Sequence, residues 1–71
     1  MEFDEYKIHL GHRIQELRRS RDLTQERVAE ILSMDAVSIG YIEQGRRVPK
    51  ISTLYKLSQI YDVSMEEFFK I

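Results

Sequence analysis

The sequence predicts an all-α fold, a compact bundle of five helices formed by residues 1–71 as a single domain. Three observations support this prediction. A chain of 71 residues can bury only one small core. Its apolar residues recur at intervals of three and four, which is the period of one helix face. Residues that favour the N-cap position of a helix stand directly before several of these apolar runs.

The first helix is expected over residues 5–20. Asp4 precedes this segment and is the expected N-cap, because its carboxylate can accept a hydrogen bond from a free backbone amide. The apolar residues on the inner face of this helix are Phe3, Tyr6, Leu10, Ile14 and Leu17.

Two short helices follow, over residues 25–32 and 36–44. Thr24 and Asp35 are their expected N-caps, and Gly45 ends the second of them, because glycine readily adopts the left-handed conformation that follows a helix. The connection, Ser33-Met34, is very short. Two helices joined in this way must cross sharply, which is the geometry of a helix-turn-helix.

The rest of the chain contains a basic loop and two further helices. The loop is RRVPK, residues 46–50. A helix over 51–61 should bury Ile51, Leu54, Leu57 and either Ile60 or Tyr61. The last helix, over 65–69, begins at a predicted capping box formed by Ser64 and Glu67.

Composition and charge limit the function. There is no cysteine, which excludes disulfides and cysteine-ligated metals. The acidic N-terminus and the absence of a long apolar run predict a cytoplasmic protein with no membrane partner. The net charge is −1, but residues 11–56 carry +3 and each end of the chain carries −2. The central segment therefore suits an anionic partner.

Four segments of the sequence resemble a known family. They are LTQERVAEIL (23–32), SIGYIEQG (38–45), RRVPK (46–50) and STLYKLSQIYDVSMEEF (52–68). They resemble the helix-turn-helix of the lambda repressor and Cro class, or Xre class, of transcription regulators. The resemblance implies a second helix lying over the DNA backbone and a third helix in the major groove. It also implies a phosphate contact from Gln25 and a structural salt bridge between Arg18 and Glu43.

The helix over 36–44 has two faces. Ile39 and Ile42 lie on one and should face the core. The other is unusually apolar and faces either DNA or another protein. Ala36 and Val37 can contact thymine methyl groups, which predicts an operator rich in A·T pairs. The candidates for reading bases are Ala36, Val37, Gly40, Tyr41 and Gln44.

Affinity for DNA should come mainly from phosphate contacts around this helix. The candidates for these contacts are Gln25, Ser38, Arg46, Arg47 and Lys50, with Arg13 and Arg27 as further candidates.

No residue pattern predicts an enzyme, and no cofactor or small-molecule ligand is expected. His9, His12 and Glu16 share a surface of the first helix, but polar residues belong on that face in any case, so no metal site is predicted.

A single reading helix contacts few base pairs, so a homodimer is expected. Candidates for its interface are Ile8, Tyr61, Phe69 and Ile71, with Tyr55 as a further possibility; the alternative is that these residues fill the core of a monomer. Two functions remain open. The favoured one is a sequence-specific, double-stranded DNA-binding transcription regulator, expected to be a homodimeric repressor that occupies an operator. The other is a protein-binding adaptor or antitoxin-type module with the same fold.

Overall fold

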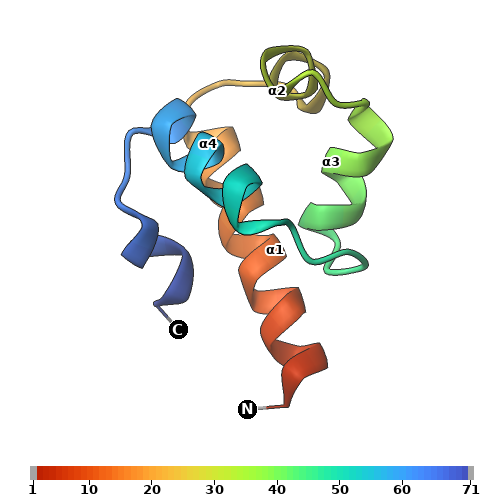
Figure 1. Cartoon of the computed structure of the whole chain (residues 1–71), viewed down its shortest axis with the longest axis vertical. Helices are drawn as coiled ribbons and strands as arrows, with labels where there is room; N and C mark the ends of the chain where they lie inside the picture. The colour runs from red at the N-terminus through yellow and green to blue at the C-terminus, as the bar shows by residue number, and fades with distance from the viewer. Residues whose placement is uncertain (1, 71) are drawn as a thin grey trace.

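The computed structural model describes residues 2–70 and is all-helical over that range (Figure 1). Its four α-helices are α1 (Phe3–Ser20), α2 (Gln25–Leu32), α3 (Ala36–Glu43) and α4 (Ile51–Tyr61). The segment predicted as a fifth α-helix is a short 3-10 helix, η1 (Met65–Phe69). Figure 1 shows α2 at one end of the molecule, with α3 beside the upper part of α1 and η1 on the opposite side. None of the described helices has the length and apolar character needed to cross a membrane.

Local hydrogen bonds begin α2 and α3. The Thr24 hydroxyl oxygen accepts from the backbone N–H of Arg27 at 3.0 Å, and an Asp35 carboxylate oxygen accepts from that of Ser38 at 2.7 Å. Both contacts satisfy amides that have no partner within their helix. The short connection between the two helices includes Ser33 in the left-handed conformation, with a φ of 56°. The crossing of α2 and α3 is therefore set by residues adjacent in sequence.

The predicted cap of α1 is wrong. The helix begins at Phe3 with Glu2 as its N-cap, and Asp4 lies within the first turn, where it forms an ion pair with Lys7 at 3.3 Å. A carboxylate in the first turn is still favourable, because it faces the positive end of the helix dipole.

The predicted capping box at η1 is also wrong. The Ser64 side chain makes no capping hydrogen bond. The Glu67 carboxylate instead accepts from Arg13 Nη2 on α1 at 2.9 Å and lies 3.5 Å from Lys70 Nζ. A partner distant in sequence therefore replaces the local one and connects η1 to α1.

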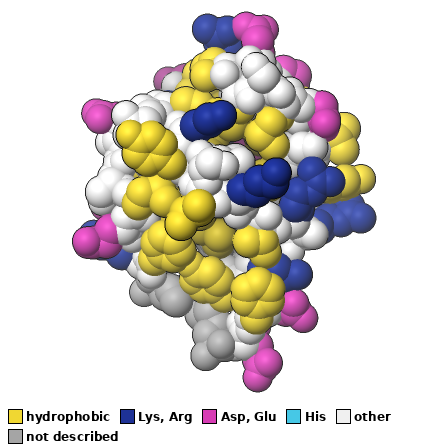
Figure 2. Space-filling model, viewed as in Figure 1, with side chains coloured by type: hydrophobic (Ala, Val, Ile, Leu, Met, Phe, Trp, Pro, Cys, Tyr) yellow, Lys and Arg dark blue, Asp and Glu magenta, His cyan; other side chains and the backbone are white. Residues whose placement is uncertain are grey.

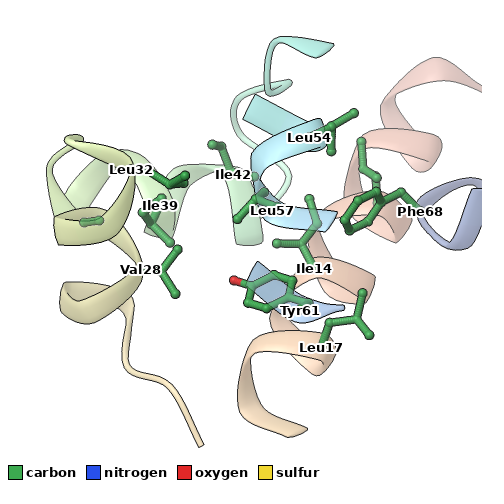
Figure 3. Close-up of a cluster of buried hydrophobic side chains, with 12 residues drawn as sticks. Ile14, Leu17, Val28, Leu32, Ile39, Ile42, Leu54, Leu57, Tyr61 and Phe68 are labelled. Atoms are coloured by element: carbon green, nitrogen blue, oxygen red, sulfur yellow. The ribbon is translucent and has the colours of Figure 1, made fainter. Parts of the chain in front are cut away.

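The core lies where α1, α2, α3, α4 and η1 converge (Figure 3). Figure 3 shows the ring of Tyr61 among side chains from several helices, and Tyr61 is 0% exposed. Two residues predicted on the inner faces of α1 and α4 are instead exposed: Phe3 is 63% and Ile51 is 75% exposed. Both stand in the first turn of their helices, and the core begins further along each helix, at Leu10 and Leu54.

Two glycines allow α1 to approach the end of α3. A Cβ atom on Gly11 would lie 2.4 Å from the carbonyl oxygen of Ile42 and 2.7 Å from that of Glu43. Gly45, which follows the C-cap residue of α3, has a φ of +75°, and a Cβ atom there would lie 2.8 Å from the Cα of Ile8. Since backbone atoms occupy these places, a larger residue at either position would push α3 away from α1.

Candidate nucleic-acid interface

A buried polar network fixes the position of α3. Arg18 on α1 donates to both carboxylate oxygens of Glu43, from Nε at 2.7 Å and from Nη2 at 3.1 Å. Arg18 Nη1 also donates to the carbonyl oxygen of Leu23 at 2.7 Å. The Glu43 side chain is 0% exposed, and its hydrogen bond raises the pKa of Arg18 above the usual value. The salt bridge implied by the family resemblance is thus present and joins α1 to the end of α3.

Gln25 belongs to the same network. Its Nε2 donates to Glu43 Oε1 at 3.0 Å, so one of its two amide hydrogens points into the domain. The side chain is half-buried, and its second amide hydrogen has no partner within residues 2–70. Gln25 therefore holds the first turn of α2 against α3.

Gly40 does not lie on the open surface of α3, contrary to the predicted stripe of base-reading residues. It is buried, and a Cβ atom at this position would lie 3.6 Å from Gln25 Oε1 and 3.8 Å from Gln44 Nε2. The reason is the crossing of α2 over α3, which the helical period of α3 alone does not reveal. Ala36 is half-buried against the core, whereas Val37 is 62% exposed.

Two arginine side chains lie near the aromatic ring of Tyr41. The guanidinium carbon of Arg46 lies 4.6 Å from the centre of the Tyr41 ring, and that of Arg47 lies 5.6 Å from it. A cation over an aromatic face is stabilised by the electron density of the ring. The half-buried ring of Tyr41 therefore positions two positive charges at the end of α3.

Arg47 reaches back to the beginning of α3. Its Nη1 donates to the Ser38 hydroxyl at 2.9 Å, and that hydroxyl donates to the second carboxylate oxygen of Asp35 at 3.1 Å. Hydrogen bonds from the backbone and side chain of Ser38 lower the pKa of Asp35, and the charge of Arg47 adds to this effect. The residue pattern alone did not predict this link. The turn at Gly45, which sends the following residues back along α3, is the signal that could have revealed it.

The remaining cations differ in their surroundings. Arg13 donates to Glu67 and faces η1, so it does not extend the cationic surface beside α3. Arg27 is paired with Glu30 on the exposed side of α2. Lys50 is exposed at the start of α4. The cations gathered at the end of α3 and in the following loop are Arg46, Arg47 and Lys50, here called the cationic loop.

The predicted interface residues also separate. Tyr61 cannot contact a second chain, because it is completely buried. Ile8 and Phe69 are 58% and 47% exposed, and Tyr55 is 57% exposed. Ile71 lies outside the described residues.

Of the three side chains considered for a metal site, His9, His12 and Glu16, only His12 and Glu16 approach each other. His12 Nε2 lies 3.7 Å from Glu16 Oε1. Within residues 2–70, no three histidine or acidic side chains come together in a way that could hold a metal ion.

Comparisons with known proteins place this geometry in a family. The model of the helix-turn-helix family HTH_3 matches residues 14–68. The transcriptional regulator PuuR of Escherichia coli K12 is 42% identical over 59 residues, which are 83% of this chain and 32% of PuuR. The chain thus spans about a third of the length of that relative.

Solved structures of helix-turn-helix and DNA-binding proteins have a similar fold. The restriction-modification controller protein C.AhdI of Aeromonas hydrophila superposes with a TM-score of 0.88 at 28% identity, over 97% of this chain and all of C.AhdI. The DNA-binding domain of BldD from S. venezulae has a TM-score of 0.78 at 29% identity, over 90% of this chain and 96% of that domain.

Proposed function

This chain belongs to the HTH_3 helix-turn-helix family, and from that premise we propose that it binds double-stranded DNA and regulates transcription. The observation that carries the proposal is the position of the cationic loop: Arg46 and Arg47 contact residues of α3, and Lys50 is exposed a few residues further along the loop. A helix flanked by cations suits the major groove, because the helix can reach base edges while neighbouring cations contact phosphates.

The proposed reading face is narrower than the stripe expected from the helical period. Val37 is its most exposed apolar side chain and can contact a thymine methyl group. Gln44 is exposed at the other end of the helix and can donate to a base edge. Lys50 and Arg46 are the proposed phosphate contacts, supported by a remaining amide hydrogen of Gln25.

Selection from a pool of random duplexes tests DNA binding directly. We expect enrichment of a defined site and a steep loss of affinity with increasing salt, because phosphate contacts release counterions. Arg46→Ala and Lys50→Ala should each reduce the slope of log affinity against log salt by about one. Lys56→Ala is the matched control, since Lys56 is an exposed lysine of α4 outside the cationic loop. Failure to enrich any duplex would favour the protein-binding adaptor or antitoxin-type function instead.

We also propose that the protein acts as a homodimeric repressor on two half-sites. Figure 2 shows a broad area of hydrophobic side chains on the face formed by α4, η1 and the lower part of α1, next to a group of lysine and arginine side chains. Exposed apolar residues of these elements include Ile8, Ile51, Tyr55 and Phe69. A second copy of the chain would cover this surface and double the number of base pairs contacted.

Sedimentation over a range of protein concentrations tests the dimer. Phe69→Glu should shift the equilibrium towards the monomer, because it would place a charge in an apolar interface. Ile31→Glu is the control: Ile31 is an apolar residue of similar exposure, 46% against 47% for Phe69, but it lies on α2. A monomer at all concentrations, or an equal effect of both substitutions, would exclude this interface. Decreased transcription from a promoter that overlaps the selected site would support repression.

A further inference from the structure

The two neighbouring arginines of the cationic loop have different positions along α3. Arg46 lies over the Tyr41 ring, and its backbone N–H donates to the carbonyl oxygen of Tyr41 at 2.9 Å. Arg47 extends further back, to the Ser38 hydroxyl in the first turn of α3. Both guanidinium groups therefore lie near the Tyr41 ring, but only that of Arg47 also bonds to the first turn of α3.

Two contacts and one neighbouring negative charge favour this position of Arg47. Its Nη1 donates to Ser38, its guanidinium lies 5.6 Å from the centre of the Tyr41 ring, and the Asp35 carboxylate next to Ser38 supplies a negative charge. The negative charge offsets the positive end of the α3 dipole, which would otherwise repel a cation. Since the side chain is already ordered, less conformational entropy is lost when it binds a ligand.

The first turn of α3 is the part of this helix that is best placed to reach bases. In a helix-turn-helix, residues near the N-terminus of the reading helix contact base edges. Val37, adjacent to Ser38, is 62% exposed at this end. Ala36, Val37 and Ser38 lack the side chains that usually bind guanine, so a donor for that base must come from elsewhere.

The chemistry of Arg47 supplies this donor. A guanidinium has five N–H groups in a planar fork, and within residues 2–70 only the bond to Ser38 engages those of Arg47. The free edge of the fork can donate two parallel hydrogen bonds to the O6 and N7 atoms of guanine. Arg46 has no hydrogen-bonded anchor on the first turn, so its charge is suited to a phosphate.

We propose that Arg47 is a specificity-determining residue that reads one guanine in the major groove, with Ser38 and Tyr41 as its positioning residues. This inference rests on the proposed function and changes its expected operator. The site should contain one G·C pair at a fixed place beside thymines contacted by Val37. Arg47 thereby moves from the phosphate contacts to the base contacts.

Binding measurements on the selected duplex and its single-base variants test the proposal. The wild-type protein should lose affinity roughly tenfold when the guanine is replaced, as expected for one bidentate arginine–guanine pair. Arg47→Lys should remove most of this discrimination, because lysine keeps the charge but lacks the planar fork. Ser38→Ala should weaken the discrimination, because Arg47 loses the hydroxyl that positions it. The helix cap should persist, because the backbone N–H of residue 38 still donates to Asp35. Arg46→Ala is the matched control and should reduce affinity for all variants equally.

The outcomes separate this proposal from the one on which it rests. If the wild-type protein enriches no duplex, DNA binding itself fails. If a site is enriched but Arg47→Lys keeps the same order of base preferences, Arg47 contacts phosphates and the proposal is wrong. Loss of discrimination in Arg46→Ala as large as in Arg47→Lys would also contradict it. A circular dichroism melt of each variant distinguishes these effects from unfolding.

Discussion

Two arginine–glutamate pairs connect α1 to other elements, and they differ mainly in burial. In the first, Arg18 and Glu43 approach to 2.7 Å, and their side chains are 10% and 0% exposed. In the second, Arg13 and Glu67 approach to 2.9 Å, with side chains 36% and 28% exposed. The distances are similar, but water and salt screen only the second pair effectively. The comparison indicates that burial, more than distance, decides how much each pair matters to the fold.

The largest effect is expected from Glu43→Gln. This substitution keeps the size of the side chain but leaves the Arg18 charge buried without its counter-ion. Loss of one partner of a buried pair costs about 3–5 kcal/mol, which is a large part of the stability of a small domain. Chemical denaturation followed by circular dichroism measures the difference. A free energy of unfolding equal to that of the wild-type protein would show that burial does not strengthen this pair.

A smaller but clear effect is expected from Gly11→Ala, which tests the close approach that the buried pair requires. The new methyl group would meet backbone carbonyl oxygens of Ile42 and Glu43 and would force α1 and α3 apart. Overpacking of this kind costs about 1–3 kcal/mol. Gly40→Ala is the matched control, because its nearest neighbour would lie at 3.6 Å and alanine favours a helix. If both variants unfold at the same denaturant concentration, the interpretation of Gly11 is wrong.

Glu67→Gln should have only a slight effect. Its partner Arg13 remains partly exposed to water after the substitution, so no charge is left unpaired in the interior. We expect a melting temperature only slightly below that of the wild-type protein at neutral pH. A decrease as large as that of Glu43→Gln would contradict the comparison.

The smallest effect concerns pH. Hydrogen bonding to Arg13, with a further contribution from Lys70, holds the pKa of Glu67 below its usual value of 4.5. The carboxylate therefore contributes stability above this value, and the contribution is lost as the pH falls through the lowered pKa. Thermal melts of wild type and Glu67→Gln should differ by a constant amount near neutral pH and converge in acid. Divergence in acid would give the wrong sign for this linkage.

Apart from the cap of α1, features set by neighbours in sequence could be predicted well, and features set by distant neighbours could not. Thr24 and Asp35 cap α2 and α3 because their partners are three residues away. Ser64 forms no such cap: the backbone N–H of Glu67 donates to the Ser64 carbonyl oxygen at 3.0 Å, and the Glu67 carboxylate accepts from Arg13, 54 residues away. Helical period placed Val37 on the surface, but it could not show that α2 covers Gly40.

The same distinction applies to the cationic loop. Charge and position identified Arg46, Arg47 and Lys50 as candidates for DNA contact. Residue spacing did not predict that Tyr41 positions two of them, and only the turn at Gly45 pointed to the bond between Arg47 and Ser38. Likewise, Tyr61 and Ile60 were equally suited to the inner face of α4 by spacing, and only packing shows that Tyr61 is the buried one.

The complete burial of the Glu43 carboxylate has a consequence for how the protein responds to its ionic surroundings. Dissolved ions cannot reach this carboxylate, whereas they compete freely for the exposed side chains of Arg46 and Lys50. Raising the salt concentration should therefore release a bound anion, while the position and orientation of α3 stay the same. The buried charges that stabilise the fold are thus separate from the exposed charges proposed to bind DNA, so an anionic ligand could dissociate at high salt without unfolding of the domain.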